Sequence, residues 1–516
     1  MSELDHVGAG MDRRELLIKG AQLAAVASVG SSLVAPDAYA KRLRWPSAKL
    51  PSSAASEIDP SQFFSKRLLQ LYGEEANRFK LRQPGADNTE LYVRRYTSRL
   101  RRAGLQGVRR EPVPMKLWQA RSWSLSVDGK KLPNTFYIPY TQRTGSSGVS
   151  AEMVFVDGSP GQDLKGKIAV FDVGYTALPL AAFAAASYPG ALHNIDLAQS
   201  AGQLYERPWL NSVGDSIDAA IEGGAVGMIG IWPDLPGKWA RQYTPYDAEF
   251  FPIPGLWLDS VTGAKVRDLA GNGAKATIKL DAKVRNVVSH NVIGFIPGKS
   301  KELTVLHTHT DGTNGMEENG QIGILGAAQY MARLPREALE RTVMVYLSTG
   351  HFAGGNGIRH FLERHANDLV PRITSILTLE HLGCTEWKPG ADGVIRPTGK
   401  PELGAGFCPQ AQGMVDPLIG FLHRLPMSGT VARPFLPLPI EGEKTLGWPG
   451  EGTYFWMIKG LLDGNFITGP YGLITADLDI SGMVDYKLMR KSAFSAVKAT
   501  LELAAADRGD LQPIGP

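Results

Sequence analysis

The sequence predicts an α/β protein in which a mainly parallel sheet is sandwiched between helices and carries a β-rich insertion. After residue 286, short apolar runs alternate with amphipathic stretches of about ten or more residues, which is typical of parallel strands joined by helices. Residues 112–284 differ, because short β-type runs there are separated by glycine and proline. We therefore expect an α/β domain formed by residues 61–111 and 285–508, with a β-rich domain of residues 112–284 inserted into it.

The first 40 residues read as an export signal. Arg13 and Arg14 precede an apolar stretch, residues 23–34, and Ala38-Tyr39-Ala40 supplies a small-x-small cleavage pattern. This order resembles a bacterial twin-arginine signal, and the apolar stretch is too short for a stable membrane span. We expect an exported, periplasmic or secreted protein without a stable membrane span after cleavage, with residues 41–60 as a linker.

Charge and cysteine content narrow the class of protein. The formal charge is +4, and loss of residues 1–40 raises it by two, which is mild for this length and does not indicate nucleic-acid binding. Two cysteines are present, Cys384 and Cys408, and neither belongs to a Cys-x-x-Cys motif. They form either one disulfide or two buried thiols, and the sequence leaves both open. A homodimer also stays open.

The secondary structure expected for the α/β domain follows from its hydrophobic spacing. Residues 61–107 have apolar side chains at helical intervals. Beyond the insertion we expect strands at residues 292–296, 303–306, 342–347 and 373–379, and helices at residues 322–334, 357–365 and 487–504.

A histidine-rich stretch follows the second of these strands. His307, His309 and Asp311 stand at alternating positions, so their side chains point to one side, and a loop with Glu317 and Glu318 comes next. Imidazole and carboxylate groups at the carboxyl end of a parallel strand suit a divalent cation, and open α/β sheets bind ligands at that edge. The stretch therefore predicts a metal site, against the alternative of a solvated loop.

Several segments, in this order, carry a family resemblance. NVIGFIPGK, VLHTHTDG, GGNGIRHF and ILTLEHLG resemble the zinc aminopeptidase family that includes glutamate carboxypeptidase II and the non-catalytic transferrin receptor. LKGKIAVFDVG and AAIEGGAVGMIGI, both within residues 112–284, resemble the protease-associated domain, a lid or wall beside the site in families that carry it. The resemblance implies two zinc ions that share a bridging aspartate, with a glutamate as general base.

Carried onto this chain, the ligands of the first zinc are largely kept. His309 matches the histidine ligand, and Asp311 matches the carboxylate that orients its ring. Glu380 matches an acid at the end of a later strand. The bridging position falls on Glu318 or Asn319, and the sequence does not decide between them.

The ligands specific to the second zinc are lost. The family's Glu-Glu pair aligns with His351 and Phe352, and its distal histidine falls near Leu473. The resemblance therefore implies one divalent ion, most simply zinc, held by His309, Glu380 and Glu318, with His351 replacing the glutamate as base. It is also compatible with no bound metal at all.

Two functions from different classes follow. In the first, the chain is an exported metal-dependent hydrolase of peptide or amide-like bonds, acting on a peptide or another small molecule. In the second, it is a catalytically inactive binding or structural protein on a peptidase scaffold. A serine-type hydrolase has little support, because there is no Gly-x-Ser-x-Gly and only Thr349 shares a strand face with His351. His307, His381 and Glu317 are expected to line the pocket.

Overall fold

The computed structural model describes residues 58–156, 162–196, 200, 202–436 and 446–513. The predicted export signal and nearly all of the predicted linker lie outside these residues. Among the residues that are described, no helix is both long and apolar enough to cross a membrane.

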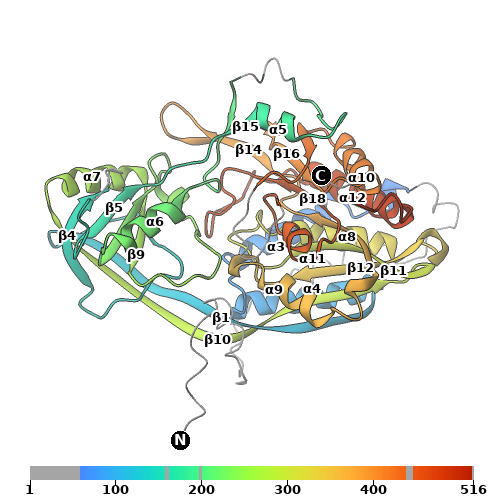
Figure 1. Ribbon diagram of the computed structural model, residues 1–516, viewed down its shortest axis with the longest axis horizontal. Coiled ribbons are helices and arrows are strands. Elements are labelled where there is room, and N and C mark those ends of the chain that lie inside the picture. Colours follow the sequence, from blue (N-terminus) through green and yellow to red (C-terminus); the bar gives the residue numbers. More distant parts are fainter. Residues whose placement is uncertain (1–57, 157–161, 197–199, 201, 437–445, 514–516) are drawn as a thin grey trace, which may run out of the picture.

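Two long antiparallel strands connect the halves of the molecule (Figure 1). β1 (Gln106–Val127) and β10 (Lys275–Ile296) are each 22 residues long and pair along almost their whole length. The predicted domain boundaries at residues 112 and 284 fall inside these strands. The chain thus passes between the α/β half and the inserted half through a continuous two-stranded ribbon. The predicted domain boundaries rested only on a change in composition along the chain.

The α/β half contains the mainly parallel part of the sheet. Its strand order is β17-β16-β18-β13-β11-β12-β10, and β11 runs parallel to both β12 and β13, which in turn runs parallel to β18. The ends of four parallel strands, in the order β18-β13-β11-β12, therefore lie side by side in the middle of this half. The strands are β11 (Ser300–His309), β12 (Arg341–Ser348), β13 (Ile373–Leu379), β16 (Gly404–Phe407), β17 (Gly429–Ala432) and β18 (Asp463–Thr468).

Helices cover both faces of this sheet, as the sequence predicts. In β12, Val343 and Val345 pack into one apolar cluster, while the alternating Met344 and Tyr346 pack into another. The first cluster includes residues of α3 (Lys66–Phe79), α4 (Asp87–Arg102), α8 (Gly320–Met331), α10 (Gln412–His423) and α12 (Tyr486–Ala505). The second includes residues of α9 (Asn356–Arg364) and α11 (Thr453–Lys459).

The inserted half is built around another apolar cluster, which extends to Phe352 and Leu473 of the α/β half. β4, β5, β8 and β9 run parallel, and β3 pairs antiparallel with β9. The elements are β3 (Thr135–Tyr137), β4 (Val149–Phe155), β5 (Ile168–Asp172), α6 (Val213–Glu222), β8 (Gly227–Ile231), β9 (Gly255–Leu258) and α7 (Ser260–Gly271).

A segment of the inserted half returns to the α/β half, and we call its described residues, 174–196, 200 and 202–210, the strap. It contains β6 (Leu178–Pro179), α5 (Leu180–Ala186) and β7 (Leu204–Tyr205). Ser187 pairs with Ala432 at the edge strand β17, and the Tyr188 hydroxyl donates to the Cys408 carbonyl. In Figure 1, α5 accordingly lies above β16 at the far edge of the sheet.

Cys384 and Cys408 are both buried and both free. Burial raises the pKa of each thiol. The alternative of two buried thiols therefore holds, and the disulfide is wrong.

Candidate metal centre

The ends of neighbouring parallel strands bring four ionisable side chains together. His309 ends β11, Glu380 and His381 follow β13 directly, and Glu317 lies in the loop between β11 and α8. All four are essentially buried. They gather at the carboxyl edge of the sheet, where open α/β folds place their ligands.

The distances describe a compact donor set. His309 Nε2 lies 3.7 Å from both Glu317 Oε1 and Glu380 Oε2. His381 Nε2 lies 3.7 Å from Glu317 Oε1 and 4.0 Å from Glu380 Oε2. The Nε2 atoms of both histidines and Oε2 of Glu317 are buried without a hydrogen-bond partner. Imidazole nitrogen with carboxylate oxygen is a donor set for zinc or a similar divalent ion, so these residues fit a metal.

Backbone carbonyls fix the histidine rings. His309 Nδ1 donates to the Asp311 carbonyl over 2.8 Å, and His381 Nδ1 donates to the Thr468 carbonyl. Because each Nδ1 is occupied by these bonds, each Nε2 is left to face the shared point, and His309 offers a lone pair there once its ring is neutral. His381 has a positive φ of 54°, which frees its side chain from the strand alternation that would turn it away from Glu380.

Glu380 is held by the neighbouring loop and strand. Its Oε1 accepts from the Glu451 backbone N–H (2.9 Å) and from Asn465 Nδ2 (3.0 Å), which leaves Oε2 for His309. Burial alone would raise the pKa of Glu380, but the positively charged His309 ring, 3.7 Å away, lowers it strongly. Burial likewise opposes protonation of His309, yet Glu317 and Glu380 raise the pKa of His309 well above its usual value.

His351 lies on the open side of this group. Its Nε2 is 3.7 Å from Glu317 Oε1, and its side chain is 13% exposed, more than those of His309, Glu317, Glu380 and His381. Burial and the charge of His309 hold the pKa of His351 well below its usual value, so the ring is neutral. The Asp311 carboxylate shapes the turn beneath it, accepting from the N–H groups of Gly350 and Phe352 over 2.8 Å each.

Comparison with known proteins identifies the fold. No family model matches the sequence, and no curated protein sequence does. Among solved structures, a peptidase M28 precursor from Shewanella amazonensis matches with a TM-score of 0.61 and 15% identity, over 87% of this chain and 99% of that one. A zinc aminopeptidase from Bacillus subtilis matches with a TM-score of 0.59 and 14% identity, over 87% and 98%. An aminopeptidase from an Aneurinibacillus strain matches with a TM-score of 0.54 and 14% identity, over 86% of this chain and 94% of that one. The chain has the zinc-aminopeptidase fold.

Within this zinc-aminopeptidase fold, the bridging position differs from what the sequence suggested. Glu318 pairs with the fully buried Arg82, and the Asn319 side chain both donates to and accepts from the Leu382 backbone. Arg82 needs a counter-charge in the interior, and Glu318 supplies it. Glu318 is therefore turned away from His309, and its neighbour Glu317 occupies the place that we had assigned to it.

The role expected of the Asp311 side chain also needs correction. The Asp311 carbonyl orients His309, whereas its carboxylate holds the turn that carries His351. Because the chain bends directly after His309, the carbonyl reaches Nδ1 and the carboxylate points to the neighbouring strand end.

The two positions that the resemblance assigns to the second zinc are apolar here. Phe352 and Leu473 belong to one buried apolar cluster, and the Phe352 ring lies 4.7 Å from that of Tyr246. Neither side chain offers a metal ligand. In the part of the chain that the structure describes, the groups able to hold an ion are His309, His351 and Glu380, or His309, Glu317 and His381.

His307 lies below the centre rather than in it. Its Nδ1 is 2.9 Å from the Thr378 hydroxyl and its Nε2 is 3.1 Å from that of Ser348, so both ring nitrogens are occupied. Burial lowers the pKa of His307 to about 3. It serves as a neutral, hydrogen-bonded wall.

Sequence reasoning missed several residues that support the site. Arg82, Glu451, Asn465 and Thr468 lie far from the histidine-rich stretch in sequence and in no motif. Tyr246 of the inserted half was missed as well, although its ring lies 5.7 Å from that of His351. Burial, followed by the charges of Tyr454 and Glu317, raises the pKa of Tyr246. The phenol beside the centre therefore stays neutral.

Proposed function

We propose that this chain is an exported metal-dependent hydrolase of peptide or amide-like bonds that works with one divalent ion, with zinc as the expected metal. The observation that carries the proposal is the convergence of His309 Nε2 and His381 Nε2, both buried without a hydrogen-bond partner, on Oε1 of the buried Glu317, 3.7 Å from each. A buried polar group without a partner costs about 1–3 kcal/mol, so a cation at their common point would remove a considerable penalty.

The residues that would hold the ion are His309, His381, Glu317 and Glu380. When bound, such an ion supplies Lewis-acid chemistry for attack on a carbonyl group. The chain contributes rings locked in the correct tautomer by the Asp311 and Thr468 carbonyls. A preformed and buried donor set of this kind needs little rearrangement on binding.

His351 is our candidate for the general base. It is neutral, as a base must be before it accepts a proton, and its Nδ1 has no partner. Glu317 lies 3.7 Å from the other ring nitrogen and would offset the positive charge that the imidazole gains. The low pKa of His351 makes the ring a weak base, which predicts a slow enzyme.

The inserted half would act as a protease-associated-like wall over the centre. Tyr246 reaches His351 from that half, and the Tyr140 hydroxyl donates to the Phe352 carbonyl. Both contacts place the insertion against the turn that carries the proposed base.

A binding or structural protein remains the second candidate. The apolar pair Phe352 and Leu473 favours it, because both stand at positions where the family resemblance implies ligands of a second ion. Metal content and hydrolysis, measured on the same preparation, distinguish the two candidates.

Elemental analysis of the purified chain tests the proposal first. We expect about one zinc per chain, lost in His309→Ala and His381→Ala and retained in the control His360→Ala on α9. The same preparations are then assayed on aminoacyl and peptidyl amides. Bound metal without turnover would support the second candidate, the binding protein. The hydrolase proposal would be overturned if the chain held no stoichiometric metal and was not stabilised against heat by zinc, manganese or cobalt.

A further inference from the structure

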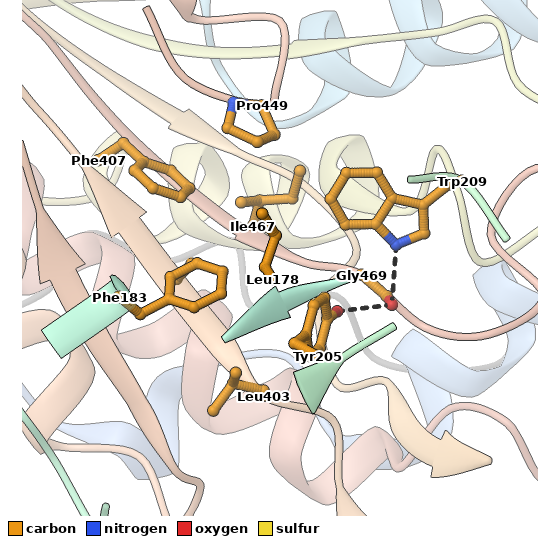
Figure 2. Close-up of a pocket in the computed structure, with 10 residues that line it drawn as sticks. Leu178, Phe183, Tyr205, Trp209, Leu403, Phe407, Pro449, Ile467 and Gly469 are labelled. Atoms are coloured by element: carbon orange, nitrogen blue, oxygen red, sulfur yellow. Dashed lines mark hydrogen bonds between the residues drawn. The ribbon is translucent and has the colours of Figure 1, made fainter. Parts of the chain in front are cut away.

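The hollow beneath the strap adjoins the candidate metal centre (Figure 2). The Tyr205 hydroxyl and Trp209 Nε1 both donate to the Gly469 carbonyl there. Gly469 follows Thr468, whose carbonyl accepts from His381. This hollow therefore belongs to the site already described. Another hollow lies against the β1–β10 ribbon, and we call it the ribbon pocket.

The ribbon pocket lies where the ribbon meets residues 140–143 and 250–251 of the inserted half. Its volume of about 520 Å³ falls within the range of about 300–1,000 Å³ that is typical of small-molecule sites. Trp118 of β1 and Tyr140 are buried and form its floor, whereas Arg143 and Val284 of β10 are exposed at its mouth. No residue that lines it belongs to the donor set of the metal centre.

The floor of the ribbon pocket offers aromatic carbon to a ligand. Trp118 Nε1 donates to the Thr141 carbonyl and the Tyr140 hydroxyl donates to the Phe352 carbonyl, over 3.0 Å each. The polar atoms of both rings are thus bonded to the backbone. Phe250 extends this surface, since its ring meets that of Tyr140 edge to face with 5.5 Å between the centroids. A flat aromatic ring packs well against walls of this kind.

The charge at the ribbon pocket is positive. The charged residues that line it are Arg143 and Lys283, and no acidic residue does so. Neither side chain forms an ion pair or a hydrogen bond with the described residues. By contrast, Arg121 on the same ribbon is paired with Asp281. An unpaired guanidinium beside an aromatic wall suits a carboxylate, which it can bind through two parallel hydrogen bonds.

The loop that carries Arg143 is held on both sides without a ligand. The Gln142 N–H donates to the Ile253 carbonyl over 3.2 Å. The Thr144 N–H donates to the Leu280 carbonyl of β10 over 2.8 Å. Because the backbone on either side of Arg143 is fixed, a ligand would have to order only the arginine side chain.

We propose that the ribbon pocket binds a small aromatic carboxylic acid, with its ring against the aromatic floor and its carboxylate on Arg143. Lys283 adds positive charge at the same pocket. This inference goes beyond the proposed hydrolase function and does not rest on it, because the residues that would hold the ion take no part in the pocket.

Calorimetric titration of three probes that share one ring tests the proposal. Indoleacetate has a carboxylate, indoleacetamide is its neutral counterpart, and tryptamine has a cation. We expect indoleacetate to bind about tenfold more tightly than indoleacetamide, because a hydrogen bond to a charged group contributes on that order, and tryptamine to bind most weakly. Binding of indoleacetate no tighter than that of the amide would overturn the proposal.

Two matched pairs of variants locate the site. Arg143→Gln removes the guanidinium, and its control is Arg94→Gln, at an exposed arginine of α4 that forms no ion pair with the described residues. Val284→Trp fills the mouth, and its control is Val288→Trp on the same strand, since the two valines are 49% and 44% exposed. We expect Arg143→Gln to weaken only indoleacetate, by about tenfold, and Val284→Trp to weaken indoleacetate and indoleacetamide alike. Both controls should bind as the parent does, and circular dichroism checks folding.

A variant that lacks the metal separates the ribbon pocket from the metal centre. Carboxylates also bind metal ions, so indoleacetate is titrated into His309→Ala as well. Unchanged affinity in this variant supports the ribbon pocket. Loss of binding in His309→Ala, or unchanged binding of indoleacetate in Arg143→Gln, would overturn it. Absence of hydrolytic activity would count against the proposed function alone.

Discussion

The imidazole rings of His309 and His351 stack with 4.2 Å between their centroids and 21° between their planes. Two stacked rings in a buried site cannot both be positively charged at low cost. The neighbouring carboxylates decide which ring takes the second proton. Burial disfavours a charge on either ring, but Glu317 and Glu380 raise the pKa of His309, whereas the charge of His309 lowers the pKa of His351 further. The two stacked rings thus have different electrostatic properties, which suit His309 to the proposed role of metal ligand and His351 to that of proton acceptor.

The first prediction concerns His351. If it is the base, His351→Ala should lower kcat by about 10²- to 10⁴-fold, since general-base catalysis contributes on that order. The zinc content should stay near one per chain, because four other donors remain. Steady-state kinetics and elemental analysis measure both quantities, with His360→Ala as control. Loss of zinc in His351→Ala would instead make His351 a ligand.

Metal binding should compete with protons. The pKa of His309 is raised in the metal-free chain, so near neutral pH its imidazole is protonated and must lose that proton to become a ligand. The apparent affinity for zinc should therefore rise with pH up to the pKa of His309, by about tenfold per pH unit. Calorimetry in two buffers of different ionisation enthalpy should show release of about one proton per ion. Identical enthalpies in both buffers would contradict this.

Much of the fold could be predicted because its strands are uniformly apolar. The strand expected at residues 373–379 has those bounds in the structure, and β11 and β12 contain the predicted runs. The elements between residues 384 and 485 were not predicted. β16 consists of Gly404-Ala405-Gly406-Phe407, too poor in β-branched side chains to read as a strand, and α10 contains Pro417.

The site could be predicted only in part, because its loops follow no periodicity. The strand pattern indicated His309 and the family resemblance indicated Glu380. Glu317 and Glu318 are neighbours, however, and no spacing rule says which of them faces inward. A distant arginine decides this, since Arg82 pairs with Glu318. His381 joins the centre through a positive φ that alternation along a strand does not foresee.

Replacing Arg82 should destabilise the chain. Its guanidinium is fully buried, pairs with Glu318 and donates to the carbonyls of Ala76 and Asn314. Arg82→Met leaves the Glu318 charge uncompensated, which costs about 3–5 kcal/mol of the free energy of unfolding. Urea denaturation measures the loss, with Arg109→Met, from a half-exposed ion pair, as control.

A double variant separates charge from packing at this pair. Arg82→Met with Glu318→Gln should recover part of the lost stability, because no unpaired charge remains. If the double variant is no more stable than Arg82→Met alone, the lost packing and backbone hydrogen bonds account for the whole effect, and Glu318 is not held as a counter-charge.

Asp311 distinguishes the two roles considered for its side chain. Its carboxylate accepts from Gly350 and Phe352, whereas its carbonyl orients His309. Asp311→Ala removes two hydrogen bonds to a charged acceptor, at about 3–6 kcal/mol of unfolding free energy, and loosens the turn that positions His351. Turnover should fall while the zinc affinity changes by less than about tenfold, because the carbonyl is retained. Asp392→Ala, at an exposed carboxylate paired with Arg396, is the control. If zinc affinity falls by a larger factor than turnover, the Asp311 carboxylate orients His309, as the family resemblance implied, and this prediction is wrong.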